Sequence, residues 1–358
     1  MYVGYLWRIF LLFLFCWGCA NANNTRDSND FSIVCLYGCE FSDLEKAIIA
    51  TRPGGTVYIK AEVLNTCGLI TKSLKIVGEL KAGKRPHLMS TSCRGKGALI
   101  IEAPNVEISN LEISDINVGD NNGACIRVGL AAKNVTLNNI YCHDSQNGVL
   151  ASFYNAGELR VSDSIFERCG AGGRSHGAYI QTDGDIVFKN VQFLSSKGVG
   201  HSLKVSAKNT LIEGSIIAAL DGFNSRAIDH FGGGVLVVRN SIIQQGPKSD
   251  NRDMIGLAFE ENRLQKGKHS VLLENNWIIF DQQAELLSLM SFNRGHLFGG
   301  QKLGDITVRN NKIVAMSSVN MPSVVFEGNK FFKSRKEAGL FEFDGSLSSL
   351  PALIPASF

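Results

Sequence analysis

The sequence predicts an all-β fold in which coils of short strands stack into a solenoid. Three observations lead to this prediction. Short runs of alternating apolar residues recur along the chain, and most of them end at Asn, Asp or Gly. The 358 residues include 37 Gly but only 7 Pro, and Gly and Asn tolerate the positive φ of tight turns. Helical patterns of about ten residues between the runs are absent, which disfavours a βαβ fold.

The repeat unit is a strand of period two followed by a turn residue. Its clearest copy is residues 106–113, VEISNLEI, with the turn residue at Asn110. The turn residue recurs at Asn139, Asp163, Asn190, Gly214, Asn240, Asn275, Asn310 and Gly328. A unit of this length cannot bury its apolar face alone, so we expect stacked units to share one core, with equivalent strands about 4.8 Å apart.

A second strand is expected midway through each coil. The runs that predict it are residues 97–100, 123–126, 148–151, 177–180, 202–205, 227–230 and 254–257. The spacing of the turn residues rises from 26 residues before Asn240 to 35 residues after it. We therefore expect loops to protrude at residues 246–252 and 294–304.

The repeat domain is expected to span residues 40–332, with a capping helix at its N-terminal end. Ser42 and Glu45 form a capping box, so Ser42 is the expected N-cap of a helix over residues 40–52. Residues 53–55, PGG, would end this helix before a first strand at residues 56–59. The repeat is lost in residues 333–358, which we expect to wrap the far end.

The N-terminus has the pattern of a secretory signal peptide, assigned to residues 1–22. Arg8 precedes an apolar run at residues 9–17, and residues 20–22 form an A-x-A cleavage pattern. The mature chain would then begin with an N-terminal segment, residues 23–39. We expect an exported protein, periplasmic or extracellular, without a transmembrane domain after cleavage. A signal anchor that is never cleaved is the alternative.

Seven cysteines remain after removal of the signal peptide, and an oxidising compartment favours disulfides among them. We expect pairs Cys35–Cys39 and Cys67–Cys93, and the odd number leaves at least one thiol without a partner in the chain. A cysteine zinc site is disfavoured because the mature chain contains no C-x-x-C. The net charge of only +3 disfavours a nucleic-acid partner.

One face of the predicted solenoid gathers titratable side chains. Alternation along the second strands predicts an outward ladder of Cys125, Leu150, Tyr179, Lys204 and Asp229. His176, His201 and Arg226 each precede a ladder residue by three positions, so three coils stacked at strand spacing would bring these groups within about 10–12 Å. Converging groups of this kind are typical of a catalytic or anion-binding site. The alternative is an exposed Lys204–Asp229 salt bridge beside buried turn histidines.

The chemistry that fits this patch is proton abstraction next to a carboxylate, as in uronate polymers. We expect Lys204, Arg226 and Arg174 to neutralise the carboxylate. His176 or His201 would be the base, because the pKa of histidine lies near neutral pH. Tyr179 would protonate the leaving oxygen, Asp229 would orient a histidine or Lys204, and Gln181 would contact the substrate. Proton return from the opposite face would instead give C5 epimerisation.

The repeat and the expected cap resemble the pectate-lyase-like superfamily of single-stranded right-handed parallel β-helix proteins. That superfamily includes polysaccharide lyases, glycoside hydrolases, epimerases and non-catalytic adhesins, so the resemblance implies a polysaccharide partner without choosing an activity. The chain is most similar to uncharacterised exported bacterial β-helix repeat proteins. The shared runs are residues 176–179, HGAY, residues 200–204, GHSLK, residues 228–229, ID, and residues 245–247, QGP.

Two further resemblances are partial. Residues 174–180, RSHGAYI, with Lys204 resemble elements of polygalacturonases, but residues 146–149, QNGV, lack the paired aspartates that those hydrolases need. Residues 142–145, CHDS, resemble the D-P-H-D region of mannuronan C5-epimerases without its first Asp and its Pro, so we interpret them as a turn.

The expected function is therefore a polysaccharide lyase or C5-epimerase acting on an acidic glycan. A non-catalytic glycan-binding module is the alternative, and a glycoside hydrolase is third. We expect a monomer and no obligatory metal. Calcium stays open as a cofactor, but the outward ladder offers only Asp229 as a carboxylate ligand, with Asp221 on an adjoining turn.

Overall fold

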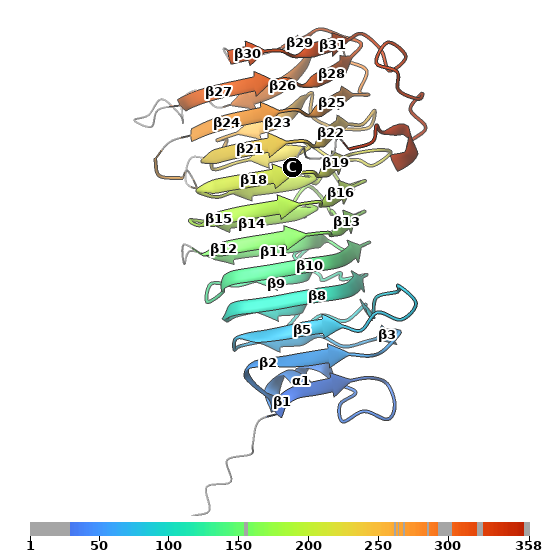
Figure 1. Ribbon diagram of the computed structural model, residues 1–358, viewed down its shortest axis with the longest axis vertical. Helices are drawn as coiled ribbons and strands as arrows, with labels where there is room; N and C mark the ends of the chain where they lie inside the picture. Colours follow the sequence, from blue (N-terminus) through green and yellow to red (C-terminus); the bar gives the residue numbers. More distant parts are fainter. Residues whose placement is uncertain are drawn as a thin grey trace, which may run out of the picture.

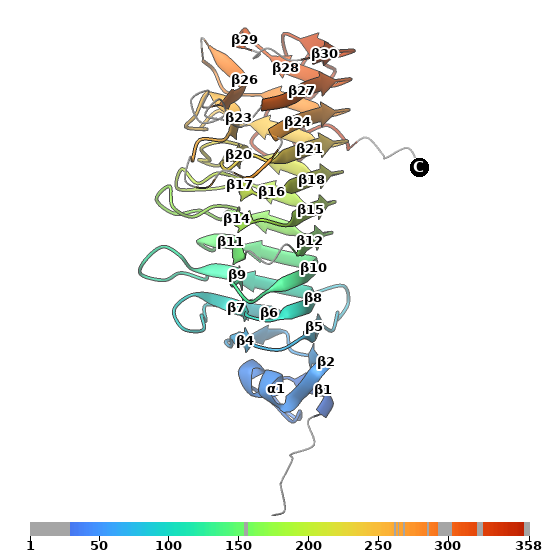
Figure 2. The same cartoon turned by 90° about the vertical axis from the view of Figure 1, so that its left-hand side faces the viewer.

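The computed structural model describes residues 29–153, 157–260, 263, 265–267, 269–284, 286–292, 303–320 and 325–353. The chain folds as a right-handed parallel β-helix, whose coils stack along one long axis (Figures 1 and 2). The expected signal peptide and residues 294–302 of the expected second loop lie outside the described residues. None of the helices in the described part of the chain has the length and apolar character that crossing a bilayer requires.

One parallel sheet consists of the strands predicted midway through each coil. We call it the site sheet, and its neighbouring strands in order are β4 (Gly68–Ile70), β7 (Gly97–Ile101), β9 (Ala124–Val128), β11 (Asn147–Phe153), β14 (Ala178–Thr182), β17 (Leu203–Ser206), β20 (Ile228–His230), β23 (Asp253–Leu257), β26 (Leu287–Phe292) and β29 (Val319–Asn320). The seven predicted runs are all confirmed as strands, with bounds shifted by at most a few residues.

A second parallel sheet of 21 strands forms the other walls, in two columns. The first column contains β1 (Asn29–Val34), β2 (Thr51–Ile59), β5 (Leu74–Gly78), β8 (Pro104–Ser114), β10 (Lys133–His143), β12 (Glu158–Ser162), β15 (Asp185–Lys189), β18 (Asn209–Glu213), β21 (Val235–Arg239), β24 (His269–Glu274), β27 (Leu303–Arg309) and β30 (Val325–Glu327). The second contains β3 (Val63–Leu64), β6 (His87–Met89), β13 (Ile165–Glu167), β16 (Gln192–Leu194), β19 (Ile216–Ala218), β22 (Ile242–Gln245), β25 (Trp277–Phe280), β28 (Lys312–Ala315) and β31 (Lys330–Phe332). Strands β8 and β10 run through both columns and join them into one sheet.

The predicted turn residues lie at the bend between these two columns, and all nine have a positive φ. The angle is 60° at Asn110, 52° at Asp163 and 57° at Gly214, for example. Left-handed backbone costs least at Gly, Asn and Asp, so the sequence places the bend at one position in each coil. The inward side chains of successive coils, mostly Ile, Val and Leu, then share one continuous core.

The N-terminal end differs in detail from the prediction. Helix α1 (Leu44–Ala50) is shorter than residues 40–52, and its N-cap is Asp43 rather than Ser42, because the Asp43 carboxylate accepts a hydrogen bond from the Lys46 amide. Strand β2 begins at Thr51 and includes the expected helix stop at Pro53. Strand β1 precedes the helix and pairs in parallel with β2. The capping role of α1 stays a prediction.

Both expected disulfides, Cys35–Cys39 and Cys67–Cys93, are confirmed. A third, Cys125–Cys142, joins the site sheet to the second sheet across the core. Burial raises the pKa of the remaining thiol, Cys169, to about 12, and its sulfur lies 3.8 Å from that of Cys142.

The C-terminal residues do not wrap the far end. Residues 333–353, with a short 3-10 helix η2 (Leu347–Ser349), return along the flank of the second column, as Figure 1 shows. There Leu350 covers outward apolar side chains such as Ile242 and Trp277, and Arg335 forms a buried ion pair with Asp281. These outward positions are apolar, so the segment that covers them removes apolar surface from water.

Candidate active site

Strand register brings the predicted polar residues of the site sheet together. Tyr179 pairs with Lys204, and Lys204 pairs with Asp229. The position below Leu150 is Arg127, however, and not Cys125. The prediction for Cys125 is wrong: Arg127, two residues further on, takes the ladder position, and Cys125 is fully buried in the disulfide with Cys142.

Two stacked histidines form the corner that leads into these strands. His176 Nδ1 accepts a hydrogen bond from the His201 amide at 3.0 Å, and His201 Nδ1 accepts one from the Arg226 amide at 3.1 Å. Their ring centroids are 5.2 Å apart. An accepting Nδ1 leaves the proton of a neutral ring on Nε2. Burial is the main cause that lowers the pKa of His176 to about 3 and that of His201 to about 2, so both rings are neutral.

Asp229 lies at the centre of the patch and is only 4% exposed. Its Oδ2 is 3.2 Å from His201 Nε2 and 3.7 Å from Lys204 Nζ. Burial raises the Asp229 pKa to about 6, against the opposing charges of Lys204 and Arg226. Its Oδ1 has no hydrogen-bond partner among the described residues, and a Cβ on Gly256 would lie 2.9 Å from that oxygen. Glycine at position 256 therefore makes room for the carboxyl group.

The segment that follows β23 covers the patch and supplies residues that the sequence analysis missed. Glu260 Oε1 lies 2.5 Å from Lys204 Nζ, and Arg263 donates a hydrogen bond to the Tyr179 hydroxyl. The Lys204 ammonium also lies 5.2 Å from the Tyr179 ring centroid and 5.1 Å from that of Phe231. The long spacing after Asn240 indicates this insertion, but the covering residues follow β23 and lie beyond the predicted loop at residues 246–252.

The remaining predicted residues lie around this centre. Arg226 forms an ion pair with Asp253 and lies 4.8 Å from the Phe259 ring centroid. Gln181 is half-buried and in register with Ser206. Arg174 is exposed on the turn before β14, and within the described residues its side chain forms no ion pair with the patch.

Every formal charge in the patch is matched within the described residues. Lys204, Arg226 and Arg263 each contact a carboxylate of Asp229, Asp253 or Glu260. These carboxylates are therefore engaged by cations. A separate group on the second sheet, His87, Glu112 and His143, has the ligand types that a transition metal prefers.

Comparison with known proteins identifies the fold but no family. No protein-family description matches the chain, and no curated protein sequence matches it significantly. The alginate lyase from Paenibacillus sp. str. FPU-7 is structurally similar, with a TM-score of 0.56 and 14% identity over 84% of this chain and 99% of that chain. ORF18 of Geobacillus virus E2 has a TM-score of 0.55 and 14% identity over 80% of this chain, which spans 56% of that protein. At these identities the likeness concerns the fold alone.

Proposed function

We propose that this chain is a polysaccharide lyase that cleaves an acidic glycan by β-elimination at a uronate residue. The observation that carries the proposal is the pairing of Tyr179 and Lys204 in register on adjacent coils. A phenol and an ammonium group thereby share one outward face, 5.2 Å apart between the nitrogen and the ring centroid. A uronate monomer presents its carboxylate and its C5 proton close together, so one sugar can engage both groups.

The reaction needs charge neutralisation before proton transfer. The C5 proton becomes acidic enough when the Lys204 ammonium binds the uronate carboxylate and stabilises the negative charge that develops. The ionised oxygen of Tyr179 takes the C5 proton, and the freed electron pair forms the C4–C5 double bond as the C4–O bond breaks. The leaving oxygen then takes that proton from the Tyr179 phenol. Arg263, which donates to the same oxygen, stabilises its anionic form.

This proposal moves the base from the histidines to Tyr179. The Nδ1 atoms of His176 and His201 accept backbone hydrogen bonds, and His201 Nε2 faces Asp229. Neither ring therefore has a lone pair free for the substrate. We assign both histidines as positioning residues, which hold the coil corner and orient Asp229. Asp229 in turn fixes Lys204.

Substrate binding requires one exchange of carboxylates. In the substrate-free chain, Glu260 forms an ion pair with the Lys204 ammonium, and the Glu260 side chain is 34% exposed. We propose that the uronate carboxylate replaces Glu260, because both groups offer the same charge-assisted contact. Gln181 and the exposed Arg174 lie where they can contact neighbouring sugars. Arg226 is held by Asp253 and has a structural role.

The test is turnover of a panel of uronate polymers: polymannuronate, polyguluronate and polygalacturonate. The unsaturated uronate product is followed by its ultraviolet absorbance, and the variant is Tyr179→Phe. We expect a loss of about 10²–10⁴-fold in kcat, the usual contribution of a proton-transfer group. Tyr58→Phe is the matched control, because Tyr58 is a partly exposed tyrosine on β2, far from the patch along the stack. Unchanged turnover in Tyr179→Phe contradicts the proposal.

A non-catalytic glycan-binding role is the second candidate, and the internal pairing of Lys204 with Glu260 favours it. Under that hypothesis, oligouronates bind and Lys204→Ala weakens binding, but no product forms. Incorporation of solvent deuterium at C5 without chain cleavage would instead identify an epimerase. A hydrolase remains third, because Asp229, the carboxyl group with the raised pKa, is enclosed beside His201.

A further inference from the structure

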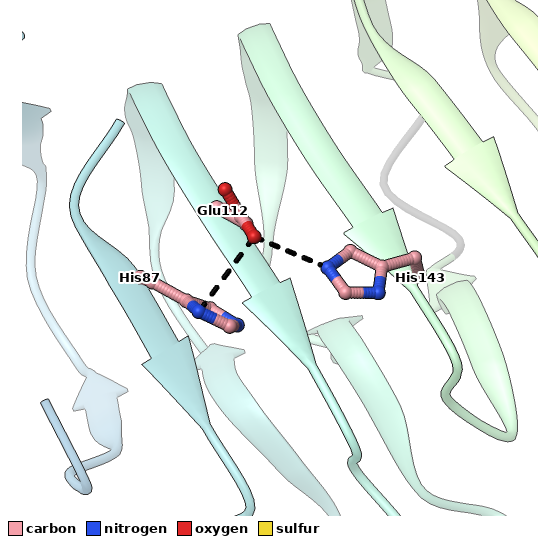
Figure 3. Close-up of side chains that lie close together, drawn as sticks. All are labelled: His87, Glu112 and His143. Carbon is pink, nitrogen blue, oxygen red and sulfur yellow. Dashed lines mark hydrogen bonds and ion pairs between the residues drawn. The ribbon is translucent and has the colours of Figure 1, made fainter. Parts of the chain in front are cut away.

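A second cluster of titratable groups lies on the second sheet, where β6, β8 and β10 run side by side. Figure 3 shows His87 and His143 on either side of Glu112, with both rings directed toward its carboxylate. Glu112 Oε1 lies 3.6 Å from His87 Nδ1 and 3.2 Å from His143 Nε2. The three potential ligand atoms all lie within 4.8 Å of one another.

The proton of His143 is held on the far side of its ring. His143 Nδ1 lies 2.8 Å from Asp144 Oδ2, an acceptor, so this nitrogen carries the hydrogen of the neutral ring. Arg168 donates two hydrogen bonds to the same carboxylate, at 2.9 and 2.7 Å, and holds it in place. In the tautomer with its proton on Nδ1, the lone pair of Nε2 lies on the side of Glu112.

His87 is oriented in the same sense by a different chain of hydrogen bonds. The Ser114 hydroxyl donates its single hydrogen to Asp115 Oδ2 at 2.6 Å. His87 Nε2 lies 2.9 Å from that hydroxyl oxygen and must therefore donate to it. This arrangement leaves the lone pair of His87 Nδ1 facing Glu112 as well.

The three potential ligand atoms, His87 Nδ1, Glu112 Oε1 and His143 Nε2, thus converge. The hydrogens on the other ring nitrogens point away from them. We propose that His87, Glu112 and His143 bind one divalent transition-metal ion of the Zn²⁺ class. Bonds of about 2.0–2.2 Å in a tetrahedral site put neighbouring ligand atoms roughly 3.4 Å apart. The distances of 3.6 and 3.2 Å lie on either side of that value. Hydrogen bonds from metal-binding histidines to carboxylates or other acceptors are the usual way to fix such rings.

The site has an open side. The side chains of His87, Glu112 and His143 are 19%, 29% and 15% exposed, so solvent reaches them. His87 and Glu112 also line a cavity of about 690 Å³, together with Lys60, Lys84, Arg85 and Tyr141. Three protein ligands leave one tetrahedral position for water or an exchangeable ligand, as in metal sites that act on substrates. This inference is independent of the proposed lyase reaction.

The experiment uses the full mature chain, freed of metal by a chelator and titrated with Zn²⁺ against a chromophoric competitor. We expect one ion per chain, and at least a tenfold weaker affinity in Glu112→Gln and in His143→Gln. Glu107→Gln is the matched control, because Glu107 lies on the same strand, is exposed and forms a surface ion pair with Lys75.

Cobalt provides a second measurement. Co²⁺ bound by His87, Glu112 and His143 should give visible absorption bands of a four-coordinate ion, and these bands should disappear in His87→Gln. Circular dichroism checks that each variant is folded. Equal Zn²⁺ affinity in wild type and Glu112→Gln would overturn the proposal, and so would the absence of a stoichiometric site in the wild type.

Discussion

The two polar clusters of this β-helix contain similar residues in opposite arrangements. In the patch on the site sheet, each cation meets a carboxylate, as Lys204 meets Glu260. In the cluster on the second sheet, two histidine lone pairs face the Glu112 carboxylate, while their protons go to Ser114 and Asp144. The direction of the hydrogen bonds, rather than residue type alone, therefore separates the proposed uronate site from the proposed metal site.

A crossed pair of variants tests most directly whether the two clusters have separate functions. Tyr179→Phe should lose about 10²–10⁴-fold in uronate turnover and keep its Zn²⁺ affinity. Glu112→Gln should lose Zn²⁺ affinity and keep its turnover. Both variants are measured in both assays. If either substitution impaired both readouts by similar factors, the two clusters would form one functional unit.

Removing one charge should affect the stability of the two clusters with opposite signs. Lys204→Met leaves Asp229 and Glu260 without their ammonium and should lower the free energy of unfolding by about 2 kcal/mol, less than for a fully buried pair because Glu260 is partly solvated. Glu112→Gln in the metal-free chain supplies an amide donor to His143 Nε2. This substitution should raise the free energy of unfolding by about 0.5–1.5 kcal/mol.

Urea unfolding without metal measures both variants. Destabilisation by Glu112→Gln comparable to that of Lys204→Met would mean that His143 is a charged partner of Glu112. The cluster on the second sheet would then be an ion-pair network rather than a metal site.

The buried histidines predict a pH dependence of stability. The pKa of His176 is about 3 in the folded chain and about 6.5 in an unfolded one. As pH falls from 6.5 toward 3, His176 becomes protonated in the unfolded state but stays neutral in the folded state. The free energy of unfolding therefore falls. In His176→Gln this loss should shrink by about 1.4 kcal/mol per pH unit.

Urea unfolding at several pH values between 4 and 7 measures the slope for His176→Gln. Tyr58→Phe is the control, because neither side chain at position 58 titrates in that range. Equal slopes in wild type and His176→Gln would show that His176 is not kept neutral by burial.

The smallest expected effect concerns the glycine above the central carboxyl group. A Cβ at Gly256 would lie 2.9 Å from both Asp229 Oδ1 and Arg226 Cδ, two groups anchored by ion pairs. Gly256→Ala should therefore cost about 1 kcal/mol of stability through overpacking. Gly119→Ala, where a Cβ meets nothing within 4 Å, is the control. Similar unfolding midpoints for both variants would contradict the tight fit over Asp229.

Local pattern was sufficient for much of the fold because the repeat requires the same backbone conformation in every coil. Asn110, Asp163 and Gly214 could be identified as bends since few residues accept a positive φ. Cys125 shows the limit of this reasoning. Alternation along the strand predicted an outward Cys125, but Arg127 takes that ladder position and Cys125 is buried in a disulfide inside the stack.

The sequence by itself determined the coil, its bends, and the stacking of Tyr179, Lys204 and Asp229, because strand period and repeat length fix which side chains share a face. Only the tertiary structure decided what covers them and which atoms carry protons. Glu260 and Arg263 lie in an insertion outside the repeat pattern. His87, Glu112 and His143 come together from coils of unequal length. Periodicity predicts neighbours along a ladder, whereas loop paths and hydrogen-bond directions depend on three-dimensional packing.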